Sequence, residues 1–332
     1  MHSFLKKSIG AALMFAAFSN VYATTLAVFP GDSLWVATDE NTQVAISSTP
    51  VGNTAAHPSP NWGIAQWYSP VAFAYPYTAT YSGSNWSIAN AASAVSYDVT
   101  TAPWLNGVYK LAQNGTASPG YSGMGCTRVG SSGQVIPWEY DLFLQPKAVS
   151  GNFGPNAASG PYGIVDSAPL NTLTALWFNL GVNVTYEIQG SGCPGDGNGV
   201  GYLLGFTFRN ETTTPTSYFF YQITFRDSRY PFDFTSPWQD DDGNFGVSES
   251  IGKVASGLVA PAPGGGRVAY SQNILPRVQL TIDNYCQTYH PSDSAHCSLA
   301  TFKLQGVFFG SQIWGQSFAG SEWDNFSVGV NP

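Results

Sequence analysis

The sequence contains little charge. Of its 332 residues 10% are charged, with 12 Lys and Arg against 20 Asp and Glu, for a formal net charge of −8. Nucleic-acid binding needs clustered Lys and Arg to neutralise phosphates, and anionic membrane surfaces attract the same side chains. The shortage of cationic residues therefore argues against nucleic acid and against anionic membranes as partners.

Long apolar runs are also missing. After residue 23 no segment approaches the roughly 18 apolar residues that a membrane span needs. The N-terminus has a shorter run, in which Lys6 and Lys7 precede SIGAALMFAAFS and a small-x-small V-Y-A sequence ends at Ala23. This is the pattern of a secretory signal peptide. We expect residues 1–23 to be removed, which predicts a secreted or periplasmic protein, with an extracellular location favoured.

Cysteines are few, and they predict disulfides rather than a metal site. The chain has 4 of them: Cys126, Cys193, Cys286 and Cys297. An even number in an exported protein favours two disulfides. Because Cys286 and Cys297 enclose a short loop, we expect them to pair, which leaves Cys126 with Cys193. The alternative joins Cys286, Cys297 and the two histidines of their loop in a metal site, but the spacing matches no usual zinc pattern.

Common catalytic motifs are absent. The sequence has no Gly-x-Ser-x-Gly elbow, no His-Glu-x-x-His helix and no phosphate-binding glycine loop. Only His57, His290 and His296 remain after the signal peptide, so a Ser-His-Asp hydrolase would have to recruit one of these three. We therefore do not expect a serine protease or esterase.

Period-two alternation of apolar residues dominates the rest of the chain, which indicates β-strands. Residues 174–189 give the clearest case, because the same apolar residues would spread around every side of a helix. Further strands are predicted from the same pattern at 34–38, 42–48, 71–81, 93–100, 137–145, 202–209, 218–226, 277–283, 301–309 and 325–330.

These strands predict an all-β fold. With 36 Gly, 22 Pro and no long helical period, we expect an antiparallel β-sandwich, of jelly-roll or concanavalin-like type with long loops. Residues 24–130 are patterned less regularly than the remainder. They either form a separate module or supply edge strands and loops to a single domain spanning 24–332, which we favour.

The alternation also predicts which side chains face the core. In PWEYDLFLQ (137–145), Trp138, Tyr140 and Leu142 should point inward, and Glu139 and Asp141 outward. At the end of the strand 174–189, Tyr186 and Ile188 should likewise be buried, with Glu187 on the opposite face.

The expected outward faces hold aromatic, amide and guanidinium groups, which suits a glycan partner. Such side chains stack on sugar rings and hydrogen-bond to hydroxyls. The candidate binding residues are Trp177, Asn183, Arg209, Gln222, Arg226 and Arg277, and the C-terminal stretch adds Trp314, Glu322 and Trp323. The alternatives are an ordinary solvated sheet face and, for the C-terminal residues, buried anchors of a closing strand pair.

Two outward acids on one strand suggest an enzyme. Glycosidases use a pair of carboxyl groups, and Glu139 with Asp141 or Glu187 is a candidate catalytic pair. The stretch EYDLFLQ resembles half of the strand motif of laminarinase-type glycosidases, with Phe143 and Leu144 where the second Glu would stand. That resemblance implies a concanavalin-like fold with part of its catalytic acids. A lyase would instead use Arg226 and a base such as Tyr218.

A second acidic cluster offers a candidate calcium site. Asp240, Asp242 and Asn244 alternate in SPWQDDDGNFG as oxygen ligands of a hard cation often do, although the spacing is not that of an EF-hand. The alternative is a solvated acidic turn.

These observations favour a secreted carbohydrate-binding protein that recognises a neutral polysaccharide. The first alternative is a polysaccharide-degrading hydrolase or lyase, and the second is an extracellular structural or surface-interaction protein. The sequence leaves the glycan and the oligomeric state open.

Overall fold

The computed structural model describes part of the chain. The described residues are 24–28, 33–36, 51–52, 62–67, 73, 79–99, 107–116, 126–129, 135–146, 168–193, 197–210, 212–213, 217–230, 232–239 and 244–332. The expected signal peptide, the expected strand at 42–48, and the residues Asp240 and Asp242 lie outside this set.

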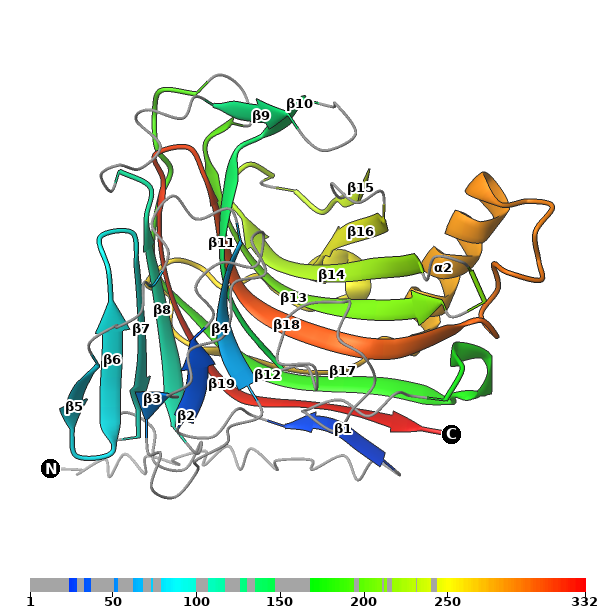
Figure 1. Cartoon of the computed structure of the whole chain (residues 1–332), viewed down its shortest axis with the longest axis horizontal. Coiled ribbons are helices and arrows are strands. Elements are labelled where there is room, and N and C mark those ends of the chain that lie inside the picture. The colour runs from blue at the N-terminus through cyan, green and yellow to red at the C-terminus, as the bar shows by residue number, and fades with distance from the viewer. Residues whose placement is uncertain are drawn as a thin grey trace, which may run out of the picture.

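Two sheets pack face to face (Figure 1). Within the described residues the larger sheet has nine strands, in the order β15-β16-β14-β13-β18-β11-β4-β2-β3. Most pairs are antiparallel, and β14–β16 and β2–β4 are parallel. Its strands are β2 (Ser33–Val36), β3 (Val51–Gly52), β4 (Trp62–Trp67), β11 (Glu139–Pro146), β13 (Gly199–Asn210), β14 (Ser217–Asp227), β15 (Thr235–Gln239), β16 (Phe245–Ser250) and β18 (Phe302–Trp314).

The smaller sheet has eight strands among the described residues, in the order β17-β12-β19-β8-β7-β6-β5, with β1 also paired to β19. Its strands are β1 (Thr24–Val28), β5 (Thr80–Ser82), β6 (Asn85–Ala89), β7 (Ser93–Asp98), β8 (Val108–Asn114), β12 (Ala175–Ile188), β17 (Val268–Asn273) and β19 (Phe318–Asn331). The remaining elements are the hairpin β9 (Thr127–Val129) and β10 (Val135–Pro137), the 3₁₀ turn η3 (Leu170–Thr172), and the helices α1 (Ile251–Val254) and α2 (Leu275–Tyr289).

This arrangement confirms the expected antiparallel β-sandwich of jelly-roll type. Strands from before residue 130 enter both sheets, since β2–β4 join the larger one and β5–β8 the smaller. We propose on this ground that residues 24–332 form one domain. Among the described residues no helix has the length and apolar character to cross a membrane.

Aromatic side chains from both sheets form the core between them. Phe309 of β18 lies 5.4 Å from Trp323 of β19 between ring centroids, and Trp62 of β4 lies 5.3 Å from Phe326. Trp323, one of the candidate glycan contacts, is fully buried, as its alternative assignment as a core anchor predicted. Each buried aromatic ring contributes about 1.5–3 kcal/mol relative to an exposed one. This layer fixes which face of every strand points inward.

The segment 277–283 is a helix, and the predicted strand there is wrong. α2 spans Leu275–Tyr289, and burial at residues 275, 278, 282 and 286 follows the helical period. Val278 and Ile282 are fully buried, whereas Leu280 between them is 47% exposed. The alternation V-Q-L-T-I is short, and two apolar residues four apart fit a helix equally well, so the pattern alone was ambiguous.

A β-bulge in β12 reverses the faces expected for its last residues. The pairing with β19 shifts between Val184 and Tyr186, so Glu187 lies opposite the buried Ala319. Tyr186 and Ile188 are consequently 41% and 55% exposed, although the alternation placed them in the core. An extra residue in one strand shifts every later side chain to the opposite face. Glu187 therefore points between the sheets.

A second bulge turns Arg226 the same way. The pairing of β13 with β14 shifts between Tyr202 and Leu203, which places Arg226 opposite the fully buried Tyr202. The Nε and Nη2 of Arg226 donate to the Oε2 and Oε1 of Glu187 at 2.7 and 2.8 Å. The prediction that both side chains face outward is wrong. Together they form an ion pair that bridges the two sheets.

Both expected disulfides are present. Cys286 pairs with Cys297, and Cys126 pairs with Cys193 across 67 residues of sequence. The cysteines therefore do not bind metal, and among the described residues no cluster of His, Cys, Asp and Glu could hold a metal ion.

The helix assignment can be tested with two matched substitutions in α2. We expect Ile282→Ala to lower the free energy of unfolding by about 2–5 kcal/mol, because it removes a fully buried side chain. Leu280→Ala should cost no more than about 0.5 kcal/mol, because Leu280 lies on the exposed face. Urea unfolding of both variants measures the difference. Equal losses would indicate a strand with both residues in the core.

The bridging ion pair can be tested by removing its cation. Arg226→Met should lower the free energy of unfolding by about 2–4 kcal/mol, because it leaves the largely buried Glu187 carboxylate without its cation. Adding Glu187→Leu should restore most of the loss. Lys110→Met, which breaks the more exposed pair with Asp98, is the control and should cost less than about 1 kcal/mol. Equal losses at both sites would contradict the burial of Glu187.

Candidate functional site

The face of the larger sheet that points away from the core, called the outer face below, has an apolar centre. Phe143, Leu203, Phe220 and Phe308 form a cluster there, separate from the main core, and each is at most 5% exposed. Tyr218 and Trp238 pack against this cluster and are half-buried. The outer face is therefore not the ordinary solvated side of a sheet. It combines aromatic rings with the polar residues described next.

Two aromatic rings of this face lie across glycines of neighbouring strands. A Cβ atom at Gly205 of β13 would lie 2.1 Å from the Phe308 ring, and one at Gly246 of β16 would lie 2.3 Å from the Trp238 ring. Any larger residue at either position would displace the ring. The sequence thus favours flat rings on this face by placing glycine beneath them.

Trp238 is held at the sheet edge by a chain of hydrogen bonds. Its ring stacks on Phe220 at 5.6 Å between centroids. Its Nε1 donates to the Oγ of Ser248 at 3.0 Å, and Ser248 in turn donates to the Oε1 of Gln222 at 2.7 Å. Gln222, a predicted binding residue, therefore lies on the outer face beside the rings. All four groups are uncharged.

Glu139 and Asp141 project from β11 onto the same face, as predicted. Their neighbours Tyr140 and Leu142 are fully buried on the core side. Glu139 is half-buried and pairs in register with Trp314 of β18, whereas Asp141 is 2% exposed and pairs with Gln312. Residues i and i+2 of a strand lie about 6.7 Å apart. Two acids in different environments thus sit side by side on one strand.

The turn after β14 adds a group that the sequence patterns did not identify. Asp227 binds Arg229 through two hydrogen bonds of 3.0 and 2.6 Å, and the Arg229 guanidinium lies 3.3 Å from the centroid of the Trp314 ring. Beyond it, Phe232 is 82% exposed and Tyr230 is 37% exposed. The segment RDSRYPF contains one acid, two arginines and two aromatics within seven residues, and this composition is the signal that could have identified the group.

The structure does not bring all predicted binding residues together. Arg209 lies on the outer face at the end of β13, opposite Tyr218. Trp177 and Asn183 belong to the smaller sheet, where Asn183 donates to Glu322 on the side away from the core. Trp177 and Asn183 therefore do not share a face with Arg209.

The catalytic pairing of Glu139 with Glu187 also fails geometrically. Glu187 lies between the sheets in its ion pair with Arg226, whereas Glu139 lies on the outer face. Arg226, the arginine that a lyase reaction would have used, binds Glu187 between the sheets and so is not on the outer face. Arg277 lies on α2, where it binds Glu249. Of the predicted acids, only Glu139 and Asp141 share a surface.

The candidate calcium site is described only at its last member. The Oδ1 of Asn244 accepts a hydrogen bond from the backbone N–H of Tyr218 at 3.3 Å. Asp240 and Asp242 lie outside the described residues. Calcium binding there stays a prediction.

Comparisons with known proteins find distant similarities of structure alone. No family model and no curated protein match the sequence. Among solved structures, the chain is similar to an endo-1,4-β-glucanase (a cellulase), with a TM-score of 0.40 and 13% identity, covering 77% of this chain and 97% of the other. An endoglucanase from Rhodothermus marinus gives 0.39 and 11%, covering 77% and 96%. A family 11 xylanase from Neocallimastix patriciarum gives 0.37 and 7%, covering 77% and 95%. These scores are too low to assign a function or a residue's role to this chain.

Proposed function

We propose that the protein is an exported polysaccharide-binding protein whose binding surface is the outer face of the larger sheet. The observation that carries this proposal is the half-buried ring of Trp238, which stacks on Phe220 and is joined to Ser248 and Gln222 in one chain of uncharged hydrogen-bonding groups. Sugar rings present C–H faces that stack on aromatic rings and hydroxyls that bond to amides. The low fraction of charged residues in the whole sequence suits a neutral ligand.

The orientation of Trp238 supports this role. Its Nε1 is already bound to Ser248, and Gly246 leaves room for the ring to lie against the sheet. A ring fixed in this way loses little conformational freedom when a ligand binds, which favours affinity. Tyr218 extends the aromatic surface on the adjacent side of Phe220. Ordered rings of this kind are what an extended sugar chain requires.

Binding can be tested with Trp238→Ala. We expect its affinity for the polysaccharide bound by the unmodified protein to fall by about tenfold or more, because a stacking surface is lost. Affinity electrophoresis against a panel of neutral plant, algal and microbial glycans identifies the ligand and measures the change. Trp177→Ala is the matched control, since Trp177 is a half-buried tryptophan of the smaller sheet. Loss of binding in the control alone would place the site on the other sheet.

Hydrolysis is a second candidate function, favoured by the two acids of β11. Their Cα atoms are about 6.7 Å apart along the strand, a separation from which the two side chains can place their carboxyl groups roughly 5–9.5 Å apart, as in glycosidases. Glu139 is half-buried and accessible to a bound chain, whereas Asp141 is almost fully buried. Glu139 would therefore be the acid/base group that exchanges a proton with the glycosidic oxygen. Asp141 would be the second carboxylate of the pair. Binding along the same face would position the bond to be cleaved.

Glu139→Gln separates the two functions. If the protein is a hydrolase, this variant should release reducing ends about 10²–10⁴-fold more slowly, because an amide cannot exchange the proton. Its affinity for the glycan should change little. Glu322→Gln, on the smaller sheet, is the control and should keep full activity. Unchanged rates in Glu139→Gln would remove this residue from the mechanism, and no release by the unmodified protein would leave binding as the function.

We further propose that the protein is exported after removal of residues 1–23. A protein that stays monomeric at micromolar concentration would argue against the structural or surface-interaction alternative. Static light scattering without glycan would decide that point.

A further inference from the structure

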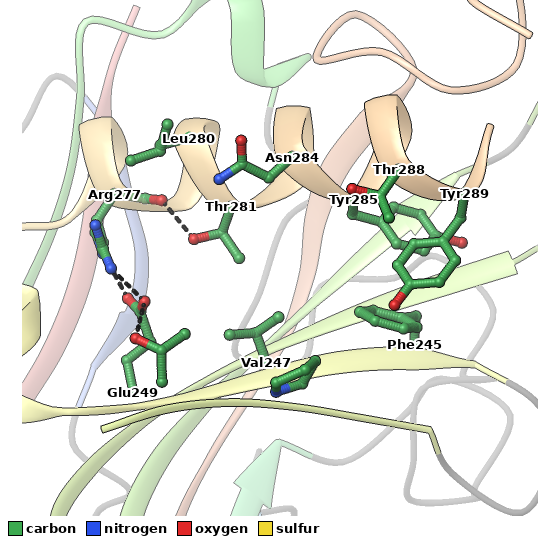
Figure 2. A pocket seen from close by; sticks show the side chains of 12 residues that line it. Phe245, Val247, Glu249, Arg277, Leu280, Thr281, Asn284, Tyr285, Thr288 and Tyr289 are labelled. Carbon is green, nitrogen blue, oxygen red and sulfur yellow. Dashed lines mark hydrogen bonds and ion pairs between the residues drawn. The ribbon is translucent and has the colours of Figure 1, made fainter. Parts of the chain in front are cut away.

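A pocket of about 250 Å³ lies between α2 and the strands β15 and β16, on the side of the sheet opposite the outer face (Figure 2). The register shows the separation, because Thr235, Pro237, Val247 and Glu249 line the pocket while the alternate residues of both strands face outward. Residues of α2 form the facing wall. The pocket is thus distinct from the surface proposed above.

One end of the pocket is closed by an ion pair that uses all acceptor positions of its carboxylate. The Oε1 of Glu249 accepts from the Oγ1 of Thr235 and from Nη2 of Arg277. Its Oε2 accepts from the hydroxyl of Tyr221 at 2.8 Å and from Nε of Arg277 at 2.7 Å. Glu249 is 1% exposed. A carboxylate with four bonds has no lone pair left for a metal ion.

The ion pair of Arg277 and Glu249 presents hydrogen-bond donors to the pocket but carries no net charge. Two of the five N–H groups of Arg277 bind Glu249, and its side chain remains 30% exposed at the pocket. Burial, and then the charge of Glu249, raises the pKa of Tyr221, which therefore stays a neutral hydrogen-bond donor. The positive charge of Arg277 is balanced by Glu249. The end of the pocket therefore suits an uncharged group with acceptor oxygens rather than an anion.

The opposite end is a wall of aromatic rings. Phe245 lies 4.8 Å from Tyr285 and 4.7 Å from Tyr289 between ring centroids. Tyr289 is 54% exposed, so its ring can be reached by a ligand. Figure 2 shows the three rings grouped at one end and the pair of Arg277 and Glu249 at the other. Apolar stacking surface and polar anchor thus lie at opposite ends of one pocket.

Between the two ends the helix wall combines hydroxyl and amide groups with one aliphatic side chain, Leu280. Thr281, Asn284 and Thr288 line the pocket along α2, and Figure 2 shows Asn284 between the ion pair and the rings and Thr288 beside the rings. From residue 277 to residue 289 an α-helix advances about 18 Å, which is the length of a few sugar residues rather than one. Among the described residues that line the pocket, the charged ones are Arg277 and Glu249. Its shape is that of a short trough.

We propose that this trough, formed by α2, β15 and β16, binds a short segment of a neutral oligosaccharide. Tyr289 stacks on one sugar ring, Asn284 and Thr288 hydrogen-bond to hydroxyls, and the outward N–H groups of Arg277 bind oxygen atoms at the far end. The site is a second glycan site on the opposite side of the sheet. It stands whether the outer face binds, cleaves or does neither.

The test uses the full-length exported protein and three neutral probes, cellotriose, xylotriose and mannotriose, with trigalacturonic acid as the charged comparison. Isothermal titration should detect binding of at least one neutral trisaccharide. Tyr289→Ala should weaken that binding by about tenfold or more, since the stacking ring is lost. Asn284→Trp should abolish it, because the exposed Asn284 can be enlarged without disturbing the core and the new ring fills the trough.

Two controls keep this result separate from the outer face. Tyr81→Ala removes a tyrosine of nearly equal exposure, 55% against 54% for Tyr289, from the smaller sheet and should leave binding unchanged. Trp238→Ala should also leave trough binding unchanged, while weakening any binding at the outer face. The proposal is overturned if no neutral trisaccharide binds or if only trigalacturonic acid binds. It is also overturned if Tyr289→Ala and Asn284→Trp bind as the unmodified protein does while Trp238→Ala does not bind.

Discussion

The aromatic layer between the two sheets is the constraint on which the other features depend. Rings of Trp62, Phe309, Trp323 and Phe326 meet across the sandwich at 4.9–5.7 Å. Burial of these rings fixes one face of every central strand toward the interior, and the alternation of side chains then places the remaining residues outside. Glu139 and Asp141 face outward because Tyr140 and Leu142 are held in this layer.

Several charged side chains in the described part of the chain bind one another within the fold. Arg226, Arg229, Arg267 and Arg277 each bind one carboxylate through two hydrogen bonds. Such paired arginines satisfy acids that burial would otherwise destabilise. The two candidate surfaces then combine amides, hydroxyls and rings with a few charged groups, such as Glu139 on the outer face and Arg277 at the trough. This composition explains why both the outer face and the trough suit neutral ligands.

The larger sheet presents different chemistry on its two sides at the β15–β16 edge. On the outer face, Trp238 lies against Gly246 and bonds to Ser248. On the core side, the main hydrophobic layer gives way to the trough beneath α2, where Glu249 and Phe245 are the alternate residues of the same strand. One strand with period two thus contributes to two separate surfaces, and α2 creates the second of them.

The sequence by itself determined the strands near 93–100, 137–145, 174–189, 202–209, 218–226, 301–309 and 325–330, the sandwich, both disulfides and the outward direction of Glu139 and Asp141. These follow from local alternation and from cysteine spacing, which need no knowledge of distant residues. Only the tertiary structure decided that 275–289 is a helix, because Leu280 could be assigned to either face until the packing of Val278 and Ile282 was known. It also decided that Glu187 and Arg226 point between the sheets. Their bulges arise from the pairing of β12 with β19 and of β13 with β14, and a single extra residue in a pairing leaves no mark in the alternation itself.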